Sequence, residues 1–133
     1  MEIVFRKPNQ LRYHEEFSFW GALILLIKIL ITGKFTHPVL IDLNSSIILD
    51  GHHRTTAARW LHLRSIPCFA VDYLNDHSVT VTTRRQNRPI NKELILSMAR
   101  QNKVFPYKTT KHQYQPYSNF VCSLSSLYRN CDT

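Results

Sequence analysis

One juncture constrains the fold of this chain more than any other feature: a strand-like run, a glycine turn and a helix-like run follow one another without a gap. Ile47-Ile48-Leu49 has the apolar, β-branched composition of a strand, and Thr55 to Leu61 has the composition of a helix. Between them lies the pentapeptide Asp50-Gly51-His52-His53-Arg54. Short strands alternate with helices on both sides of this turn, so the sequence predicts a compact α+β domain with a small mixed sheet and flanking helices.

The pentapeptide also has the composition of an anion-binding turn. Gly51 lets the backbone approach a ligand, and the first amide groups of the following helix have no acceptors inside that helix. Two imidazoles and a guanidinium bring further donors to the same place, which suits a phosphate group. The simpler interpretation, a helix entry capped by Asp50 with solvated His and Arg side chains, stays open.

Length and charge narrow the alternatives. A chain of 133 residues with 44% hydrophobic content is expected to form one compact core. Lys and Arg outnumber Asp and Glu by 17 to 9, which favours an anionic partner such as a nucleotide, a nucleic acid or an acidic membrane surface. Cys68, Cys122 and Cys131 lack the spacing of metal ligands, so reduced thiols in a cytoplasmic protein are favoured over a disulfide framework. Cys68 is expected in the core.

The stretch from Phe17 to Ile31 is apolar on nearly every side and is shorter than the roughly twenty residues that span a bilayer. It is therefore predicted to be a buried helix that ends at Gly33. Stable membrane insertion is not expected. Attachment to a membrane surface stays open, because the stretch lacks the polar face of an ordinary surface helix.

The remaining elements follow from local patterns. Val39 to Leu43 should pair with Ile47 to Leu49 around the turn-forming residues 44–46, and further strands are expected at 67–73 and, as an edge strand, at 78–83. Asn91 is predicted to cap a helix with Leu94, Ile95, Met98 and Ala99 on its apolar side. Residues 1–117 would form the domain, and residues 118–133 a C-terminal extension of which 120–127 pack.

Two further polar segments are candidates for function. His14-Glu15 precedes the apolar stretch, where a carboxylate is stabilised by the helix dipole and can accept a proton from a hydroxyl or hold a metal-bound water. The segment Phe105 to His112 brackets two threonine hydroxyls with lysines and an imidazole, a composition that suits a phosphate-binding loop. Alone, a first-turn glutamate is more often just a favourable helix charge, and a surface loop with the composition of the second segment is common.

Together, these segments resemble in order and spacing the free L-serine kinases built on the ParB/sulfiredoxin fold. The matching motifs are His14-Glu15, Asp50-Gly51-His52-His53-Arg54, Ile66-Pro67 leading to Asp72-Tyr73, and Phe105-Pro106-Tyr107-Lys108-Thr109-Thr110-Lys111-His112. The resemblance covers roughly residues 10 to 117. It implies transfer of a phosphoryl group from ADP or ATP, with Mg²⁺, to the hydroxyl of free L-serine or a similar small hydroxy amino acid, giving O-phospho-L-serine.

The resemblance also implies roles for individual residues. Glu15 would be the catalytic base, and Asp50 would lie near the Mg²⁺ of the nucleotide or fix the turn. The nucleotide phosphates would be held by Gly51, His52, His53 and Arg54, and the phosphoryl group and substrate by Lys108, Thr109, Thr110, Lys111 and His112. Lys111 stands where the family usually has arginine, so it cannot make a bidentate guanidinium contact.

Three alternatives remain. A ParB-like nucleotide-dependent DNA-binding protein would suit the basic charge, although no helix-turn-helix is evident in the sequence. A non-catalytic nucleotide-binding module would keep the turn without the chemistry. A sulfiredoxin-like reductase is the weakest, because it would need a cysteine beside the phosphate turn and the pentapeptide contains none.

Overall fold

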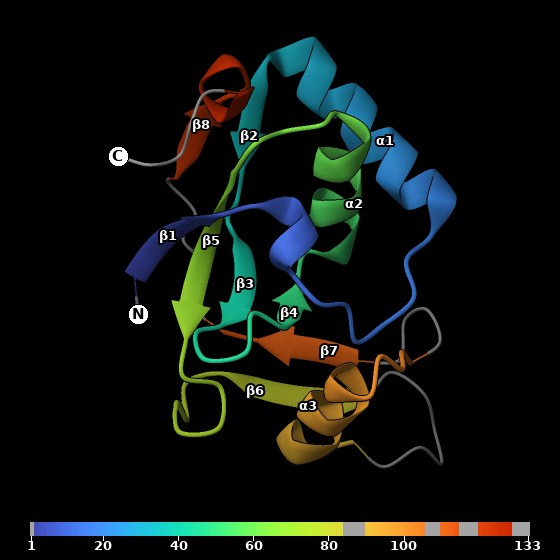
Figure 1. Cartoon of the computed structure of the whole chain (residues 1–133), viewed down its shortest axis with the longest axis vertical. Helices are drawn as coiled ribbons and strands as arrows, with labels where there is room; N and C mark the ends of the chain where they lie inside the picture. Colours follow the sequence, from blue (N-terminus) through green and yellow to red (C-terminus); the bar gives the residue numbers. More distant parts are fainter. Residues whose placement is uncertain (1, 84–89, 106–109, 115–119, 129–133) are drawn as a thin grey trace.

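The computed structural model describes residues 2–83, 90–105, 110–114 and 120–128 of the chain (Figure 1). In chain order the elements are β1 (Glu2–Arg6), the 3-10 helix η1 (Pro8–Gln10), α1 (Phe19–Thr32), β2 (Lys34–Thr36), β3 (Val39–Asp42), β4 (Ile48–Asp50), α2 (His52–Trp60), β5 (Ile66–Val71), β6 (Thr80–Thr83), α3 (Lys92–Arg100), β7 (Thr110–Gln113), β8 (Val121–Ser123) and the 3-10 helix η2 (Ser125–Tyr128). The predicted α+β class with a small mixed sheet is confirmed.

The main sheet has the strand order β1-β5-β3-β4. Strand β3 runs antiparallel to β4, as predicted for the pair around residues 44–46, and parallel to β5. Asp42 fixes the turn after β3, because its carboxylate accepts a hydrogen bond from the Ser45 backbone N–H at 3.1 Å and another from the Tyr73 N–H at 3.1 Å. These bonds fix the connection from β3 to β4, and the glycine turn follows directly after β4.

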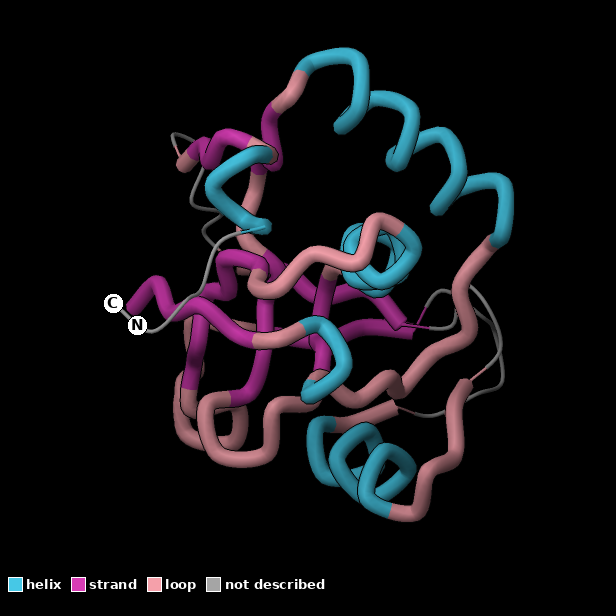
Figure 2. The backbone as a smooth tube through the Cα atoms, turned by 45° about the horizontal axis from the view of Figure 1, so that its top comes forward, coloured by secondary structure: helices cyan, strands magenta, loops and turns pink. Residues whose placement is uncertain are grey.

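Both faces of the central strands are buried, which explains their nearly unbroken apolar runs. Alternate residues of β5 point to opposite sides: Cys68 joins a core with Ala57 and Ala58 of α2, whereas Phe69 joins a second core with Ile95 of α3. The expectation that Cys68 is buried is confirmed. The sheet is thus held between α2 on one side and α3 on the other (Figure 2).

Helix α1 begins after Ser18, whose side chain accepts a hydrogen bond from the Gly21 N–H, and ends at Gly33 in the left-handed conformation, as predicted. The prediction that this helix is buried is wrong. It packs on α2 as an outer layer (Figures 1 and 2) and buries only Ala22 and Ile29, while large apolar side chains remain exposed: Phe19, Trp20, Ile24, Ile27, Leu30 and Ile31. In the ranges described, no helix is long and apolar enough to cross a bilayer.

Two small antiparallel pairs complete the fold. Strand β6 pairs with β7, and β2 pairs with β8, which lies after residue 118. The Asn91 side chain caps α3 by accepting from the Leu94 N–H at 2.7 Å. The segment 105–112 is not wholly the loop that its composition suggested, because Thr110, Lys111 and His112 belong to β7; residues 106–109 lie outside the described residues.

Candidate functional site

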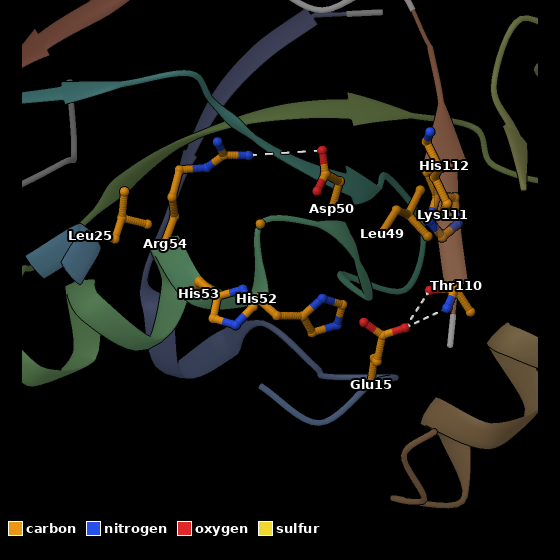
Figure 3. Close-up of a pocket in the computed structure, with 11 residues that line it drawn as sticks. Glu15, Leu25, Leu49, Asp50, His52, His53, Arg54, Thr110, Lys111 and His112 are labelled. Atoms are coloured by element: carbon orange, nitrogen blue, oxygen red, sulfur yellow. Dashed lines mark hydrogen bonds and ion pairs between the residues drawn. The ribbon is translucent and has the colours of Figure 1, made fainter. Parts of the chain in front are cut away.

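A cavity of about 310 Å³ opens where the ends of several elements meet (Figure 3). The end of β4 and the start of α2 form one side, and Glu15 with β7 forms the other. Its lining includes every site residue that the sequence predicts within the described ranges, together with Leu25 and Leu49: Glu15, Asp50, Gly51, His52, His53, Arg54, Thr110, Lys111 and His112. Segments almost a hundred residues apart in the chain therefore form one site.

The turn into α2 requires its glycine. Gly51 is the N-cap residue of α2 and has φ 112° and ψ 27°, a left-handed conformation that residues with a side chain rarely adopt. A Cβ atom there would lie 3.1 Å from both methyl carbons of Val39 and 3.3 Å from an Arg54 guanidinium nitrogen. This backbone brings the first turn of α2 to the cavity, and the amide groups of a first helical turn attract anions. Asp50 does not cap the helix.

Replacing Gly51 by alanine is expected to cost more stability than the same change at Gly33. Both residues have positive φ, so each loses about 1–2 kcal/mol through backbone strain. At Gly33 no atom lies within 4 Å of the added Cβ, whereas at Gly51 the crowding against Val39 adds to the loss. Urea denaturation of the two variants measures the difference, and equal losses would contradict the geometry of this turn.

The two histidines of the turn face inward rather than into solvent. The backbone N–H of Ser18 donates to Nε2 of His53 at 2.9 Å, and the backbone N–H of His14 donates to Nε2 of His52 at 3.3 Å. A Cβ on Gly21 would lie 3.0 Å from the His53 ring, so this glycine allows α1 to approach α2 closely. What His52 brings to the cavity is therefore chiefly its backbone amide, while its ring fixes the segment that carries Glu15.

Glu15 is positioned by β7 and by Phe105, not by the dipole of α1 as expected. Helix α1 begins only at Phe19, and the residue after Glu15 donates its backbone N–H to the Phe105 carbonyl at 2.7 Å. Oε1 of Glu15 accepts two hydrogen bonds from Thr110, from the backbone N–H at 2.6 Å and from the hydroxyl at 2.8 Å (Figure 3). The carboxylate is thereby held at the wall of the cavity.

Three imidazoles pack together at the cavity, and two of them, His52 and His112, line it. The rings of His14 and His52 are 4.6 Å apart between centroids, and those of His14 and His112 are 5.6 Å apart. Burial lowers the pKa of His14 to about 4 and that of His112 to about 3. Burial also lowers the pKa of His52, and the neighbouring histidines lower it further. All three rings are neutral near neutral pH, so Arg54 and Lys111 supply the positive charge among the described residues that line the cavity.

These histidines predict a loss of stability in mild acid. Because their pKa values are lower in the folded chain than the ordinary 6.5, the unfolded chain binds more protons as the pH falls below that value. The stability from burying them neutral is complete above about pH 6.5 and is lost as the pH falls towards about 4, by about 3 kcal/mol for His14. Thermal unfolding between about pH 7 and about pH 5 measures the slope.

A matched pair of variants assigns that slope. His14→Asn, whose amide can still donate to the carbonyl beside it, should give a shallower pH dependence than the native chain. His77→Gln, which replaces an exposed histidine, should leave the dependence unchanged. A native unfolding temperature that stays constant across this pH range would contradict the burial of neutral imidazoles.

Asp50 and Arg54 form the boundary between this cavity and a second one of about 310 Å³, which is lined also by His37, Phe69 and Tyr114. The Asp50 carboxylate accepts a hydrogen bond from the Tyr114 hydroxyl at 2.7 Å and lies 4.0 Å from the Arg54 guanidinium. Nε of Arg54 is buried and has no hydrogen-bond partner in the part of the chain that is described. The guanidinium is therefore held in place with donor capacity to spare for an anion.

Asp50 is the candidate ligand for the Mg²⁺ of a metal–nucleotide complex. No group of three His, Cys, Asp or Glu side chains that could hold an ion occurs among the described residues. Asp50 offers one carboxylate whose side chain is 49% exposed. Because Mg²⁺ is commonly bound by one or two carboxylates together with substrate phosphates, this single ligand fits the predicted role of Asp50.

Lys108 and Thr109, also predicted to bind substrate, lie outside the described residues. Sequence reasoning missed Tyr114 and the hydrogen bonds of His14. For Tyr114 a signal existed: side chains alternate along a strand, so Thr110, His112 and Tyr114 share one face of β7 and its continuation. Thr110 bonds Glu15, His112 accepts from or donates to the Tyr73 hydroxyl at 2.8 Å, and Tyr114 bonds Asp50.

The sequence and the structure of this chain were compared with those of known proteins. No protein-family model matches the sequence. A ParB-like protein from Sulfolobus acidocaldarius is 40% identical over 83 residues, which is 62% of this chain, and the chain spans about 40% of that relative's length. A conserved hypothetical protein from Pyrococcus furiosus has a TM-score of 0.84 at 15% identity, with 96% of this chain and 97% of that one covered.

Solved structures of a free serine kinase are also similar. The complex with AMP has a TM-score of 0.79 at 14% identity over 94% of this chain and 93% of that one. A variant in complex with ADP has a TM-score of 0.80 at 14% identity over 96% and 94%. The fold expected from the motifs is therefore confirmed: the chain has the α+β fold of the solved free serine kinase structures.

Proposed function

We propose that this protein transfers a phosphoryl group from ADP or ATP to the hydroxyl of free L-serine or a similar small hydroxy amino acid. One observation carries the proposal: the carboxylate of Glu15 and the first turn of α2 line the same cavity. A proton acceptor and an anion-binding helix start are the two parts that transfer to an alcohol needs, because phosphoryl transfer is catalysed mainly by alignment and by neutralising charge.

The similar solved structures support a nucleotide as the phosphoryl donor. The similar kinase structures hold AMP or ADP, and they have the same fold as this chain. In this chain the phosphates would lie against the amides of His52 and His53 at the start of α2, with Arg54 supplying a charged donor from the side. Lys111, which is exposed at the edge of the cavity, would add a second positive charge as the phosphoryl group moves.

The acceptor would lie beside Glu15. The carboxylate would take the proton from the acceptor hydroxyl as the oxygen attacks phosphorus, which is general-base catalysis by a group already held in position by Thr110. Asp50 would hold the Mg²⁺ of the nucleotide, and the ion would supply charge neutralisation between the phosphates. The modest size of the cavity, about 310 Å³, favours a small acceptor over a peptide or protein.

A panel of acceptors tests this function. Purified protein with Mg²⁺ and either ADP or ATP is incubated with L-serine, L-threonine, glycerol or L-alanine, and the products are identified by mass spectrometry. We expect phosphorylated L-serine and no phosphorylated L-alanine, which lacks the hydroxyl. Nucleotide hydrolysis that is the same with every acceptor would overturn the proposal in favour of transfer to water.

Nucleotide-dependent DNA binding is the second candidate, favoured by the net charge of +8 and by the name of the ParB-like relative. Within the described ranges no further helix follows α3 closely enough to form a helix-turn-helix, and the basic run 84–88 lies outside them. Neutralising several DNA phosphates would make duplex affinity fall steeply with salt. We expect weak duplex binding that nucleotide does not strengthen; tight, nucleotide-dependent binding with a steep salt dependence would favour this candidate.

A further inference from the structure

The hydroxyl of Thr110 lies between two acceptors, so it connects Glu15 to a second side chain. Its oxygen is 2.8 Å from Oε1 of Glu15 and 2.9 Å from Nε2 of His14. The other ring nitrogen of His14, Nδ1, is 2.6 Å from the carbonyl oxygen of Ile48. A carbonyl oxygen only accepts, so Nδ1 carries a hydrogen and Nε2 of the neutral ring carries none.

The hydrogen bonds that join Glu15, Thr110 and His14 therefore need one more hydrogen than these groups carry. A threonine hydroxyl has one hydrogen, and with Glu15 ionised and His14 neutral it has two acceptors to serve. One additional proton completes the chain: with imidazolium at His14, Nε2 donates to Thr110 and the Thr110 hydroxyl donates to Glu15. Every polar atom from the Ile48 carbonyl to the carboxylate is then paired.

Within the described part of the chain, the Thr110 hydroxyl is the route by which a proton reaches Nε2 of His14. The His14 side chain is fully buried, and Nε2 faces the Thr110 hydroxyl. Besides Glu15, the titratable groups around it in the described ranges are His52 from α2, His112 from β7 and Asp50 from β4. Asp50 favours the charged ring, and the two histidines packed against it are neutral.

We propose that Glu15, Thr110 and His14 form a proton relay, in which the proton that Glu15 takes from the acceptor hydroxyl passes through Thr110 to Nε2 of His14. This inference rests on the proposed function. As the acceptor oxygen bonds phosphorus, the bond from phosphorus to the nucleotide oxygen breaks and that oxygen keeps the electron pair. The acceptor proton moves to Oε1 of Glu15 and on from that oxygen to the Thr110 oxygen, while the original Thr110 proton moves to Nε2 of His14.

The relay gives Glu15 back its negative charge during the reaction. A neutral carboxyl would hold the Thr110 backbone N–H, now at 2.6 Å, less strongly than a carboxylate does. Passing the proton to His14 keeps this charge-assisted bond, and with it the start of β7, in place. When product leaves, the proton returns by the same path to Glu15 and then to water. His14 is thus a positioning residue that acts through Glu15.

Two variants at Thr110 test the relay by turnover. Thr110→Val removes the hydroxyl but keeps the shape and the backbone N–H, and Thr110→Ser restores the hydroxyl. We expect Thr110→Val to lose about 10- to 100-fold in kcat with KM for nucleotide and acceptor within a few-fold, and Thr110→Ser to stay within a few-fold of the native kcat. In mixtures of light and heavy water the native rate should curve with deuterium content, and the Thr110→Val rate should not. Equal kcat for all three proteins would overturn the relay.

A second measurement needs no turnover and separates failure of the relay from failure of the proposed function. Nitrogen NMR of the His14 ring at neutral pH should show hydrogen on Nδ1 and an Nε2 resonance shifted upfield by the Thr110 hydroxyl. Thr110→Val should remove that shift, and Glu15→Gln should enlarge it, because the weaker amide acceptor leaves the Thr110 proton to His14. Hydrogen on Nε2, or an unchanged resonance in Glu15→Gln, would overturn the relay. If these NMR results hold but the native protein makes no product, the proposed function fails while the shared proton stands.

Discussion

Glu15→Gln is expected to lower turnover by about 10²- to 10⁴-fold while leaving nucleotide affinity within a few-fold of the native value. The substitution keeps the local contacts, because the glutamine carbonyl oxygen can still accept the two hydrogen bonds that Oε1 accepts from Thr110. The two hydrogen bonds at the wall of the cavity are therefore kept in weaker form, while the negative charge and the ability to take a proton are lost. Turnover and nucleotide binding are measured on the same preparation.

The adjacent residue provides a matched control. Glu16→Gln makes the same chemical change at an exposed side chain outside the main cavity and should leave turnover within a few-fold. Nucleotide binding that disappears in Glu15→Gln would contradict the account, because it would make Glu15 a structural or metal-holding carboxylate. Turnover retained to within about tenfold would contradict the assignment of Glu15 as the base.

Arg54→Ala is expected to weaken nucleotide binding by about 10- to 100-fold. A hydrogen bond to a charged group contributes about 1.5–3 kcal/mol, and the Arg54 guanidinium is held beside the first turn of α2 by Asp50 at 4.0 Å. Arg54→Lys should recover only part of the affinity, because an ammonium group cannot bind two phosphate oxygens through a planar fork. Calorimetric titration with ADP and Mg²⁺ measures these differences.

Arg64→Ala is the control for that measurement. Arg64 is exposed beyond the C-terminal end of α2, the end opposite the cavity, so its removal lowers the net charge equally without touching the site. Equal loss of affinity in the Arg54 and Arg64 variants would show that binding responds to overall charge, and it would contradict a specific phosphate site at the turn.

Features governed by short-range chemistry were predictable from the sequence. The left-handed end of α1 at Gly33, the Asn91 cap of α3 and the antiparallel pair β3–β4 each depend on a few consecutive residues. The order of motifs along the chain also identified the fold, because their spacing reflects the same succession of strands and helices. These predictions needed no knowledge of which surfaces meet.

The environment of α1 could not be predicted in the same way. Apolar residues on every side of a helix normally indicate burial, yet Trp20 is 69% exposed and Ile31 is 79% exposed. Burial depends on what packs against a helix, and here only one face of α1 meets α2. The composition of a helix shows that its side chains favour an apolar environment. It does not show whether another part of the chain packs against them.

The candidate site was predictable as a set of residues but not as a network. The motifs named most of the residues that line the cavity, whereas the bonds among them join positions far apart, such as Glu15 and Thr110, which are 95 residues apart in sequence. Such contacts follow from the packing of the whole fold. The inward orientation of His52 and His53 and the relay geometry at His14 became visible only with these contacts.

Phosphorus NMR of the native protein with Mg²⁺ and L-serine, run in parallel with ADP and with ATP, tests the central claim most directly. The account predicts that the O-phospho-L-serine resonance appears with at least one donor, grows with time, and is absent without L-serine and in Glu15→Gln. Measurable nucleotide binding with no phosphoserine from either donor would contradict it, and would identify the chain as a nucleotide-binding module without kinase chemistry.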